Sequence, residues 1–272
     1  MTAMRILILL AAILTPALAA AQAPVQLGFT GRVAGLRMFT VDALVEQSEA
    51  AYRVELAYRT VGVVGALFSA DLHSRVQGRF AQMNPQPQRF LNWGHWQGKP
   101  RQTLIDYPAG EPVVVALVPP NDGEREPVLP AEQAGTVDSL SAIAMLTRQF
   151  AATGRCDGGL RVFDGRRLSA IASRTVGEEV LEADRGSFFA GPAMRCDFEG
   201  RQIGGFWLDD DRNKAARPQN GSAWLARLSP GAPPVPVRMR FDVRLLGQAT
   251  MYLTDVISPP APAVPPPAWV RH

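Results

Sequence analysis

Residues 52–59 read Tyr-Arg-Val-Glu-Leu-Ala-Tyr-Arg, with large apolar side chains at every second position. Successive side chains of a β-strand point to opposite faces of the sheet, so this spacing is typical of an antiparallel strand with one buried and one wet face. The stretch therefore predicts a mainly β protein.

Further strand-like segments lie on both sides at short intervals. The expected strands are 36–44, 67–77, 89–97, 103–107, 112–118, 159–163, 167–172, 193–199, 223–228, 235–246 and 248–257. Short strands separated by turn residues favour a meander that closes toward a barrel or a sandwich over alternating βαβ units. Two proline-containing stretches, 84–88 and 119–130, are expected to be loops, and the second, long and acidic, is a candidate flap.

One helix is expected among the strands, over residues 139–153. Asp138 and Ser139 offer N-terminal caps, and Gly154 supplies a C-terminal stop. Apolar side chains at positions 140, 143, 146 and 150 share one face at helical spacing. We expect that face to lie against the inner surface of the sheet.

Two turns are marked by glycine. Asp164-Gly165 stands between two expected strands and suits a type I′ hairpin turn, which Arg166 could extend. Gly247 is expected to form the turn between the last two strands.

The N-terminus has the features of a secretory signal peptide. Arg5 precedes nine apolar residues, 6–14, and small residues follow at 17–21. An uncleaved anchor is the alternative, but a membrane-spanning helix needs about 20 apolar residues. We expect cleavage to leave a mature chain that begins near Ala20 or Gln22 and has no transmembrane segment.

The mature chain is expected to contain one β-rich domain, residues 22–258, and a flexible tail, residues 259–272. Six of the nine residues 259–267 are proline. Such a segment adopts extended polyproline II conformations. A solvated terminus is expected, with a recognition segment as the alternative.

Charge and cysteine content narrow the class of protein. Lysine and arginine number 28 against 25 acidic residues, for a formal net charge of +3, which is too small to indicate a nucleic-acid partner. Cys156 and Cys196 are the two cysteines of the chain. In an exported protein such a pair predicts one structural disulfide, with free thiols or a redox pair as alternatives.

Several blocks of sequence together resemble the DUF3108 family of exported bacterial proteins. The blocks are Gly-Thr-Val-Asp-Ser-Leu-Ser-Ala at 135–142, Cys156, Val-Phe-Asp-Gly-Arg-Arg at 162–167, Gly-Pro-Ala at 191–193 before Cys196, and Pro-Val-Arg-Met at 236–239 before Gly247. Ser139 and Leu168 depart from the usual pattern. The resemblance implies a periplasmic protein similar to the half-open β-barrels of lipoprotein carriers, in which a curved antiparallel sheet wraps a helix and leaves an apolar cavity. It implies no catalytic residues.

No catalytic or metal-binding motif emerges from the sequence. The histidines are His73, His95 and the terminal His272, and no serine stands in a Gly-x-Ser-x-Gly motif. His73 and His95 are 22 residues apart, without the spacing of a zinc site. Residues 209–213 begin like a calcium loop, but Lys214 stands where the glycine of the sharp turn is needed. No cofactor, metal or enzymatic activity is expected.

Two clusters are candidates for ligand binding. Trp93 and His95 would share one face of a strand and Trp96 the other, where aromatic rings could line a pocket; core packing is the alternative. Arg166 and Arg167 at a hairpin tip could pair with a phosphate or lipid head group; exposed turn charges are the alternative.

These observations predict a non-enzymatic periplasmic binding or carrier protein for an apolar or amphiphilic ligand, one that is lipid or lipoprotein related. The alternative is a structural or assembly factor of the cell envelope that binds protein partners through a sheet edge or the tail.

Overall fold

The computed structural model describes residues 25–184, 186–243, 247–257, 260 and 262–271. The expected signal peptide, residues 1–21, lies outside these ranges. Thirteen strands form one antiparallel sheet. They are β1 (Val25–Val33), β2 (Leu36–Gln47), β3 (Ala51–Thr60), β4 (Ala70–Ala81), β5 (Asn84–Trp96), β6 (Lys99–Asp106), β7 (Val113–Val118), β8 (Gly158–Phe163), β9 (Leu168–Leu181), β10 (Gly191–Gly204), β11 (Gln219–Arg227), β12 (Pro234–Val243) and β13 (Gly247–Ile257).

The strand order is β7-β6-β5-β4-β3-β2-β1-β13-β12-β11-β10-β9-β8. Each strand therefore pairs with its neighbour in sequence, except that β1 pairs with β13 and joins two meanders at the centre of the sheet. The two ends of the order, β7 and β8, do not pair in the described chain, so the sheet is curved but not closed. The predicted fold, a mainly β protein with a half-open antiparallel sheet, is confirmed.

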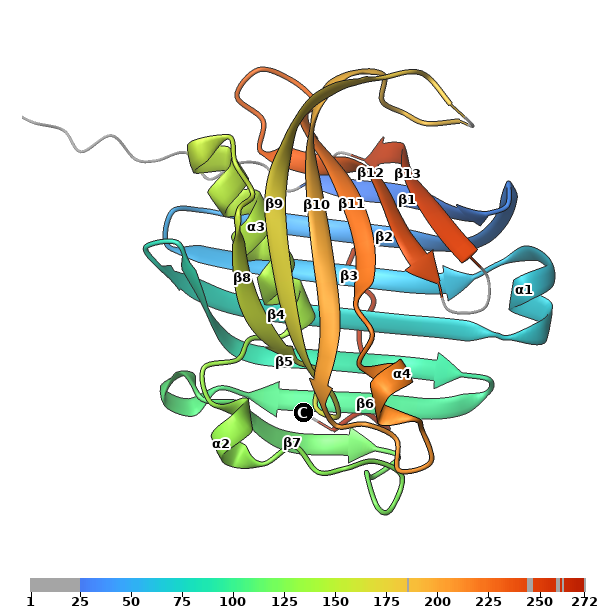
Figure 1. The fold of residues 1–272 in the computed structure, drawn as a ribbon, viewed down its shortest axis with the longest axis vertical. Helices are drawn as coiled ribbons and strands as arrows, with labels where there is room; N and C mark the ends of the chain where they lie inside the picture. The colour runs from blue at the N-terminus through green and yellow to red at the C-terminus, as the bar shows by residue number, and fades with distance from the viewer. Residues whose placement is uncertain (1–24, 185, 244–246, 258–259, 261, 272) are drawn as a thin grey trace, which may run out of the picture.

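The helices are α1 (Gly62–Leu67), η1 (Pro108–Gly110), α2 (Pro130–Gln133), α3 (Ser139–Thr153) and α4 (Arg212–Ala215). In Figure 1, β8–β11 cross in front of β3–β5, and α3 lies between the two halves, where it contacts β3, β4, β5, β8 and β12. The face of the sheet that carries α3 is called the inner face below. None of the described helices combines the length and hydropathy needed to cross a bilayer.

Helix α3 begins and ends where the sequence predicts. The Asp138 side chain accepts hydrogen bonds from the backbone N–H groups of Leu140 and Ser141, and Gly154 ends the helix with φ 68°. The predicted apolar face is only partly buried: Leu140 is buried, and Leu146 and Phe150 pack against Cys156, Cys196 and Leu225, whereas the other fully buried residues of the helix are Ser141, Ala144 and Thr147. Ile143 remains 36% exposed.

The rotation of the helix has a polar cause. Asp138 is 0% exposed and accepts a 2.5 Å hydrogen bond from the Ser141 hydroxyl, which also lies 2.8 Å from the Tyr52 hydroxyl on β3. Since the Ser141 proton is already donated, Tyr52 donates the second bond. These bonds turn the small, polar side of α3 toward the sheet.

The predicted disulfide is present. Cys156 and Cys196 are bonded, with their Cα atoms 6.1 Å apart, and both side chains are buried with Leu225. The bridge ties the segment after α3 to β10.

Several local predictions were wrong. The expected loop 84–88 is the first part of β5, because Pro87 sits beside a bulge between Gln77 and Gly78, where a strand tolerates a residue that cannot donate to the ladder. The expected strand 67–77 begins only at Ala70, after α1. The expected strand 223–228 begins earlier, because Asn220, Gly221 and Ser222 already lie within β11. Gly247, expected in the last turn, is the first residue of β13.

The C-terminal tail also departs from its prediction. Val270 is 3% exposed and packs among side chains on the outer face of β5, β6 and β7: Leu91, Trp93, Leu104 and Ala116. The backbone of Arg271 donates to and accepts from the Gln102 side chain, at 3.1 and 2.7 Å. The end of the chain therefore covers an apolar patch rather than standing free in solvent.

Candidate functional site

Two hollows on the inner face adjoin α3. The first, the apolar cavity, has a volume of about 130 Å³. Its wall is formed by β1–β3, by α3, by β11–β13, whose strand β12 begins with Pro-Val-Pro at 234–236, and by Pro233 just before that strand. Gln47 and Thr147 are the polar side chains in that wall, and the Gln47 amide donates to Thr147 Oγ1 at 3.0 Å and to the Ala144 carbonyl at 2.9 Å. The remaining wall is apolar.

The apolar cavity uses the face of α3 that the sequence marked as apolar. Ile143 and Leu146 line the cavity, and Leu146 also packs against the disulfide and Leu225 on β11. For scale, an engineered apolar cavity of about 150 Å³ binds benzene. The space is therefore sufficient for a small apolar group or the end of a hydrocarbon chain.

The second hollow, the basic pocket, lies at the N-terminal end of α3 and has a volume of about 530 Å³. It is bounded by β4–β7, by the loop 119–129, by Ser139, by the β8–β9 turn and by Trp207. Its charged side chains are Arg101, Arg125, Arg166, Arg167, Glu124 and Asp164, a formal balance of +2.

The β8–β9 turn positions Arg166 and Arg167. The carboxylate of Asp164 accepts from their backbone N–H groups at 2.9 and 2.7 Å, and the Asp164 N–H donates to the Arg167 carbonyl at 3.2 Å. The turn therefore spans four residues, and Arg166 joins it. Gly165 has φ 91°, and a Cβ there would lie 2.5 Å from Thr103 on β6. The missing side chain lets the turn sit directly on β6.

The stretch 119–130, expected as a flap, is a loop up to residue 129, where α2 follows, and this loop 119–129 forms a wall of the basic pocket. Backbone hydrogen bonds tie it to the segment that follows β10, from Glu126 N–H to Phe206 and from Leu208 N–H to Glu124. Arg125 stacks 3.7 Å from the Trp207 ring and donates to the Gly205 carbonyl at 2.9 Å. Sequence reasoning missed both Arg125 and Trp207, because nothing in the intervening sequence indicates that they meet.

The arginines of the basic pocket repel one another. Burial lowers the pKa of Arg166 below its usual value, and the charge of Arg101 adds to this shift. The pKa of Arg125 is lowered by burial and then by Arg167. Because a guanidinium stays protonated in proteins, the pocket holds partly buried positive charges that repel one another.

The predicted binding residues fall into two places. Trp96, Arg166 and Arg167 come together in the basic pocket. The side chains of Trp93 and His95 lie on the opposite face, as the alternation along β5 predicts. Trp93 stacks on His73 with ring centroids 5.3 Å apart and packs against the tail, while His95 meets Trp269 edge-on at 5.6 Å.

The two inner hollows are neighbours along β3 and β4. Leu56 lines the apolar cavity, and its register partner Ser74 lines the basic pocket. Helix α3 contributes Ser139 to the basic pocket and Ile143 to the apolar cavity. A polar, cationic space thus borders an apolar one.

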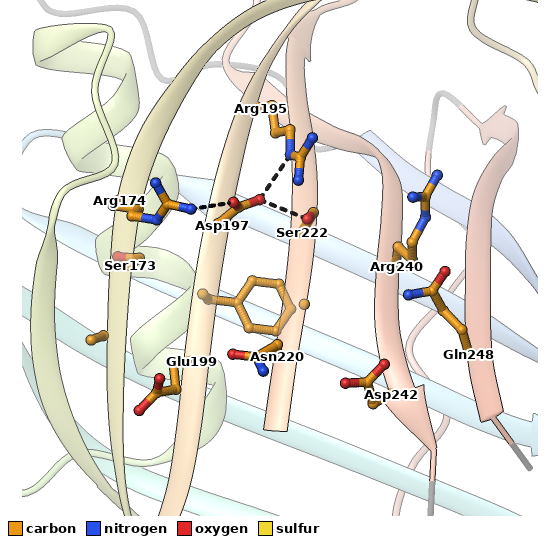
Figure 2. A pocket seen from close by; sticks show the side chains of 13 residues that line it. Ser173, Arg174, Arg195, Asp197, Glu199, Asn220, Ser222, Arg240, Asp242 and Gln248 are labelled. Atoms are coloured by element: carbon orange, nitrogen blue, oxygen red, sulfur yellow. Dashed lines mark hydrogen bonds and ion pairs between the residues drawn. The ribbon is translucent and has the colours of Figure 1, made fainter. Parts of the chain in front are cut away.

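A third hollow, the outer depression, lies across β9–β13 and has a volume of about 620 Å³. Figure 2 shows Arg174, Arg195 and Ser222 directed at Asp197, whose carboxylate accepts from them at 2.9, 2.8 and 2.7 Å. Burial acts to raise the pKa of Asp197, but the bonds from Ser222 and Arg195 outweigh it, so the pKa lies below its usual value. The charges at the centre of this depression compensate one another.

Asp138 differs from these surface carboxylates. Its burial raises its pKa to about 6 against the opposing effect of its hydrogen bonds. Tyr52 and Tyr107 flank it, and burial also raises the pKa of each phenol. The Tyr107 hydroxyl has no hydrogen-bond partner among the described residues. The arrangement anchors the start of α3.

Metal ligands do not converge in the structure. Within the described ranges, no three His, Cys, Asp or Glu side chains are grouped as a metal site would require. In the stretch that begins like a calcium loop, the Asp211 carboxylate caps α4 by accepting from the backbone of Asn213 and Lys214.

Comparison with known proteins identifies the family of the chain and a solved structure with a similar fold. No curated protein matches the chain. A solved β-barrel-like protein of the domain of unknown function DUF1849, from Brucella abortus, is similar, with a TM-score of 0.50 and 12% identity over 87% of this chain and 98% of that chain. At such low identity the likeness concerns the fold alone. The family described as a protein of unknown function, DUF3108, matches residues 27–254, and the chain belongs to this family.

Proposed function

We propose that the protein is a periplasmic binding or carrier protein, without catalytic activity, that takes up a hydrocarbon group in the apolar cavity. One observation carries the proposal. The cavity is walled by apolar side chains, and its two polar wall residues, Gln47 and Thr147, already satisfy each other. A polar ligand would find no partner there, whereas an apolar one would lose contact with water.

Export to the periplasm is supported by the N-terminal sequence and by the disulfide. Residues 1–21 have the charged, apolar and small-residue regions of a signal peptide. Disulfides persist in oxidising compartments such as the periplasm. The two features point to the same location.

The size of the cavity sets the expected affinity. Each buried methylene contributes ~0.8 kcal/mol, so a chain end of about four methylenes would contribute ~3 kcal/mol. Ile143 is 36% exposed at the cavity wall, and this marks a route from solvent into the space. Affinity for the hydrocarbon alone should be modest.

Titration calorimetry with 1-octanol tests the proposal. Ala223 is buried in the cavity wall, so Ala223→Leu fills the space. Ala152 is exposed on α3, and Ala152→Leu adds the same atoms outside the cavity. We expect octanol to bind the parent chain and the Ala152 variant but not the Ala223 variant, with circular dichroism reporting folding of all three. Equal octanol binding by both variants would remove the apolar cavity as the site.

The alternative function is an assembly factor that binds protein partners through the tail, in which residues 262–265 are exposed whereas the last described residues contact the sheet. Val270 and Arg271 are engaged with β5–β7. An interaction with a protein partner through this segment would first have to break these contacts.

A further inference from the structure

The basic pocket contains more arginines than its own carboxylates neutralise. Four arginines face two carboxylates, Glu124 and Asp164. One ion pair forms between them, from Arg167 to Asp164 at 2.8 Å. Buried or half-buried charges are normally paired, so the remaining cations indicate a missing anionic partner.

The three other arginines lack an ion pair in the part of the chain that the structure describes. Arg125 and Arg166 donate to the backbone carbonyls of Gly205 and Pro119. Arg101 is half-buried and makes no side-chain hydrogen bond among the described residues. A neutral carbonyl satisfies part of a guanidinium's hydrogen-bonding capacity and leaves its charge uncompensated.

The arginines come from separate elements and meet at one space. Arg101 lies on β6, Arg125 on the loop 119–129, and Arg166 at the β8–β9 turn. Trp96 and Trp207 supply aromatic surface beside them. Guanidinium groups bind phosphate through paired, planar N–H donors, which makes arginine the preferred residue for such recognition.

We propose that the basic pocket binds the phosphate head group of the same amphiphile whose hydrocarbon chain enters the apolar cavity, a proposal that rests on the function proposed above. A phosphate monoester carries a charge of about −1.5 to −2 at neutral pH, which matches the formal balance of the pocket better than a single carboxylate does. The 530 Å³ volume falls within the roughly 300–1,000 Å³ of ligand pockets. Leu56, which lines the apolar cavity, is the register partner of Ser74, which lines the basic pocket, so the two spaces are close enough for one amphiphile to reach both.

Three probes separate the head group from the chain: octyl phosphate, 1-octanol and inorganic phosphate. Arg101→Gln removes a charge without breaking a hydrogen bond of the described structure. Arg79→Gln removes the same charge from an exposed position on β4, outside the pocket, and serves as the matched control. Thermal unfolding followed by circular dichroism establishes that each variant is folded.

We expect octyl phosphate to bind the parent chain on the order of tenfold more tightly than octanol, since hydrogen bonds to charged groups have this strength. Arg101→Gln should abolish most of that difference and leave octanol binding unchanged. Arg79→Gln should change neither. Raising the salt concentration should weaken the binding of octyl phosphate and leave the binding of octanol unchanged.

Each contrary result identifies which proposal fails. Equal affinity for octyl phosphate and octanol, unaffected by Arg101→Gln, would overturn the head-group site and leave the apolar cavity standing. Binding of inorganic phosphate as tight as that of octyl phosphate, and lost in Arg101→Gln, would identify a site for free phosphate and overturn the lipid source. Failure of both octyl compounds and phosphate to bind would overturn the two proposals together.

Discussion

The outer depression and the basic pocket are similar in volume and both contain several arginines, yet they hold charge in different ways. Three arginines and three acidic residues line the outer depression, and Asp197 alone gathers Arg174, Arg195 and Ser222. In the basic pocket, Asp164 turns toward its own hairpin and pairs with Arg167. Counting charged residues therefore does not distinguish a structural network from a binding site. Whether the arginines are paired with carboxylates does distinguish them.

The largest expected effect concerns pH and contrasts Asp138 with Asp197. Burial raises the folded-state pKa of Asp138 from 3.8 to about 6, so the folded chain holds its proton more tightly than the unfolded chain. Its contribution is fully present below about pH 4 and is lost as pH rises through 6, a change of roughly 3 kcal/mol in the free energy of unfolding. Urea unfolding at about pH 4, 5, 6 and 7 measures it.

Asp138→Asn is the control for that pH dependence. Asparagine also caps helices, so the variant should fold, and its stability should vary less between about pH 4 and 6 than that of the parent chain. The pKa of Asp197 is lowered, so its contribution is lost only as pH falls below about 4. An unchanged slope in the Asn variant would show that another group titrates in this range.

A smaller effect on stability is expected from removing the Asp197 carboxylate, which accepts the hydrogen bonds at the centre of the outer depression. Asp197→Asn leaves Arg174 and Arg195 without their shared carboxylate oxygens, and we expect a loss of about 1–2 kcal/mol because the arginines are partly exposed. Asp242→Asn, in the same depression but exposed, should have little effect. Equal stability of the two variants in urea would mean that the pairing at Asp197 contributes nothing.

The β8–β9 turn gives the next effect in size. Gly165→Ala forces an L side chain to φ 91° and against Thr103, and we expect a cost of about 1–2 kcal/mol together with weaker octyl phosphate binding. Gly98 has φ 72° and no atom lies within 4 Å of the place that a Cβ would take, so Gly98→Ala reports the backbone strain alone. Thermal melts of both variants isolate the contact with β6, and identical melting points would exclude it.

The smallest effect is expected for the basic pocket itself. Arg101→Gln should change the unfolding free energy by less than ~0.5 kcal/mol, or raise it slightly, because the substitution removes repulsion without removing a partner. Denaturant unfolding in low salt measures the change. A loss comparable to that of Asp197→Asn would show that Arg101 is structural and would remove the contrast between the two hollows.

Much of this fold could be predicted from local sequence. Alternation identified β3, Asp138 and Gly154 bounded α3, and Asp164-Gly165 marked the β8–β9 turn. These signals act between residues that are close in sequence, so one chain segment contains them. The expected export of the chain led to the disulfide between Cys156 and Cys196.

The missed features depend on contacts between distant segments. Ser141 turns α3 because Tyr52 lies beneath it, and the helical pattern cannot show that partner. Arg125 reaches the basic pocket through its bond to Gly205, 80 residues away. Val270 is buried because β5 and β6 present an apolar outer face that requires a cover. The sequence places Trp96 in one candidate cluster and Arg166 and Arg167 in another. Only the folded sheet brings the three together.

The pairing of β1 with β13 has a consequence for how the chain acquires its structure. The centre of the sheet joins the first described strand to the last, with Thr30 and Thr254 side chains 3.5 Å apart across it. At about 5–20 residues per second, a ribosome needs roughly 10–40 s between finishing β1 and starting β13. The strands of each meander can begin to pair with their sequence neighbours as they are made. The pairing of β1 with β13 can form only after β13 has been synthesised, and pairing between such distant segments is slow. Loss of the last strand would therefore leave two sheets with exposed edges rather than a slightly smaller one.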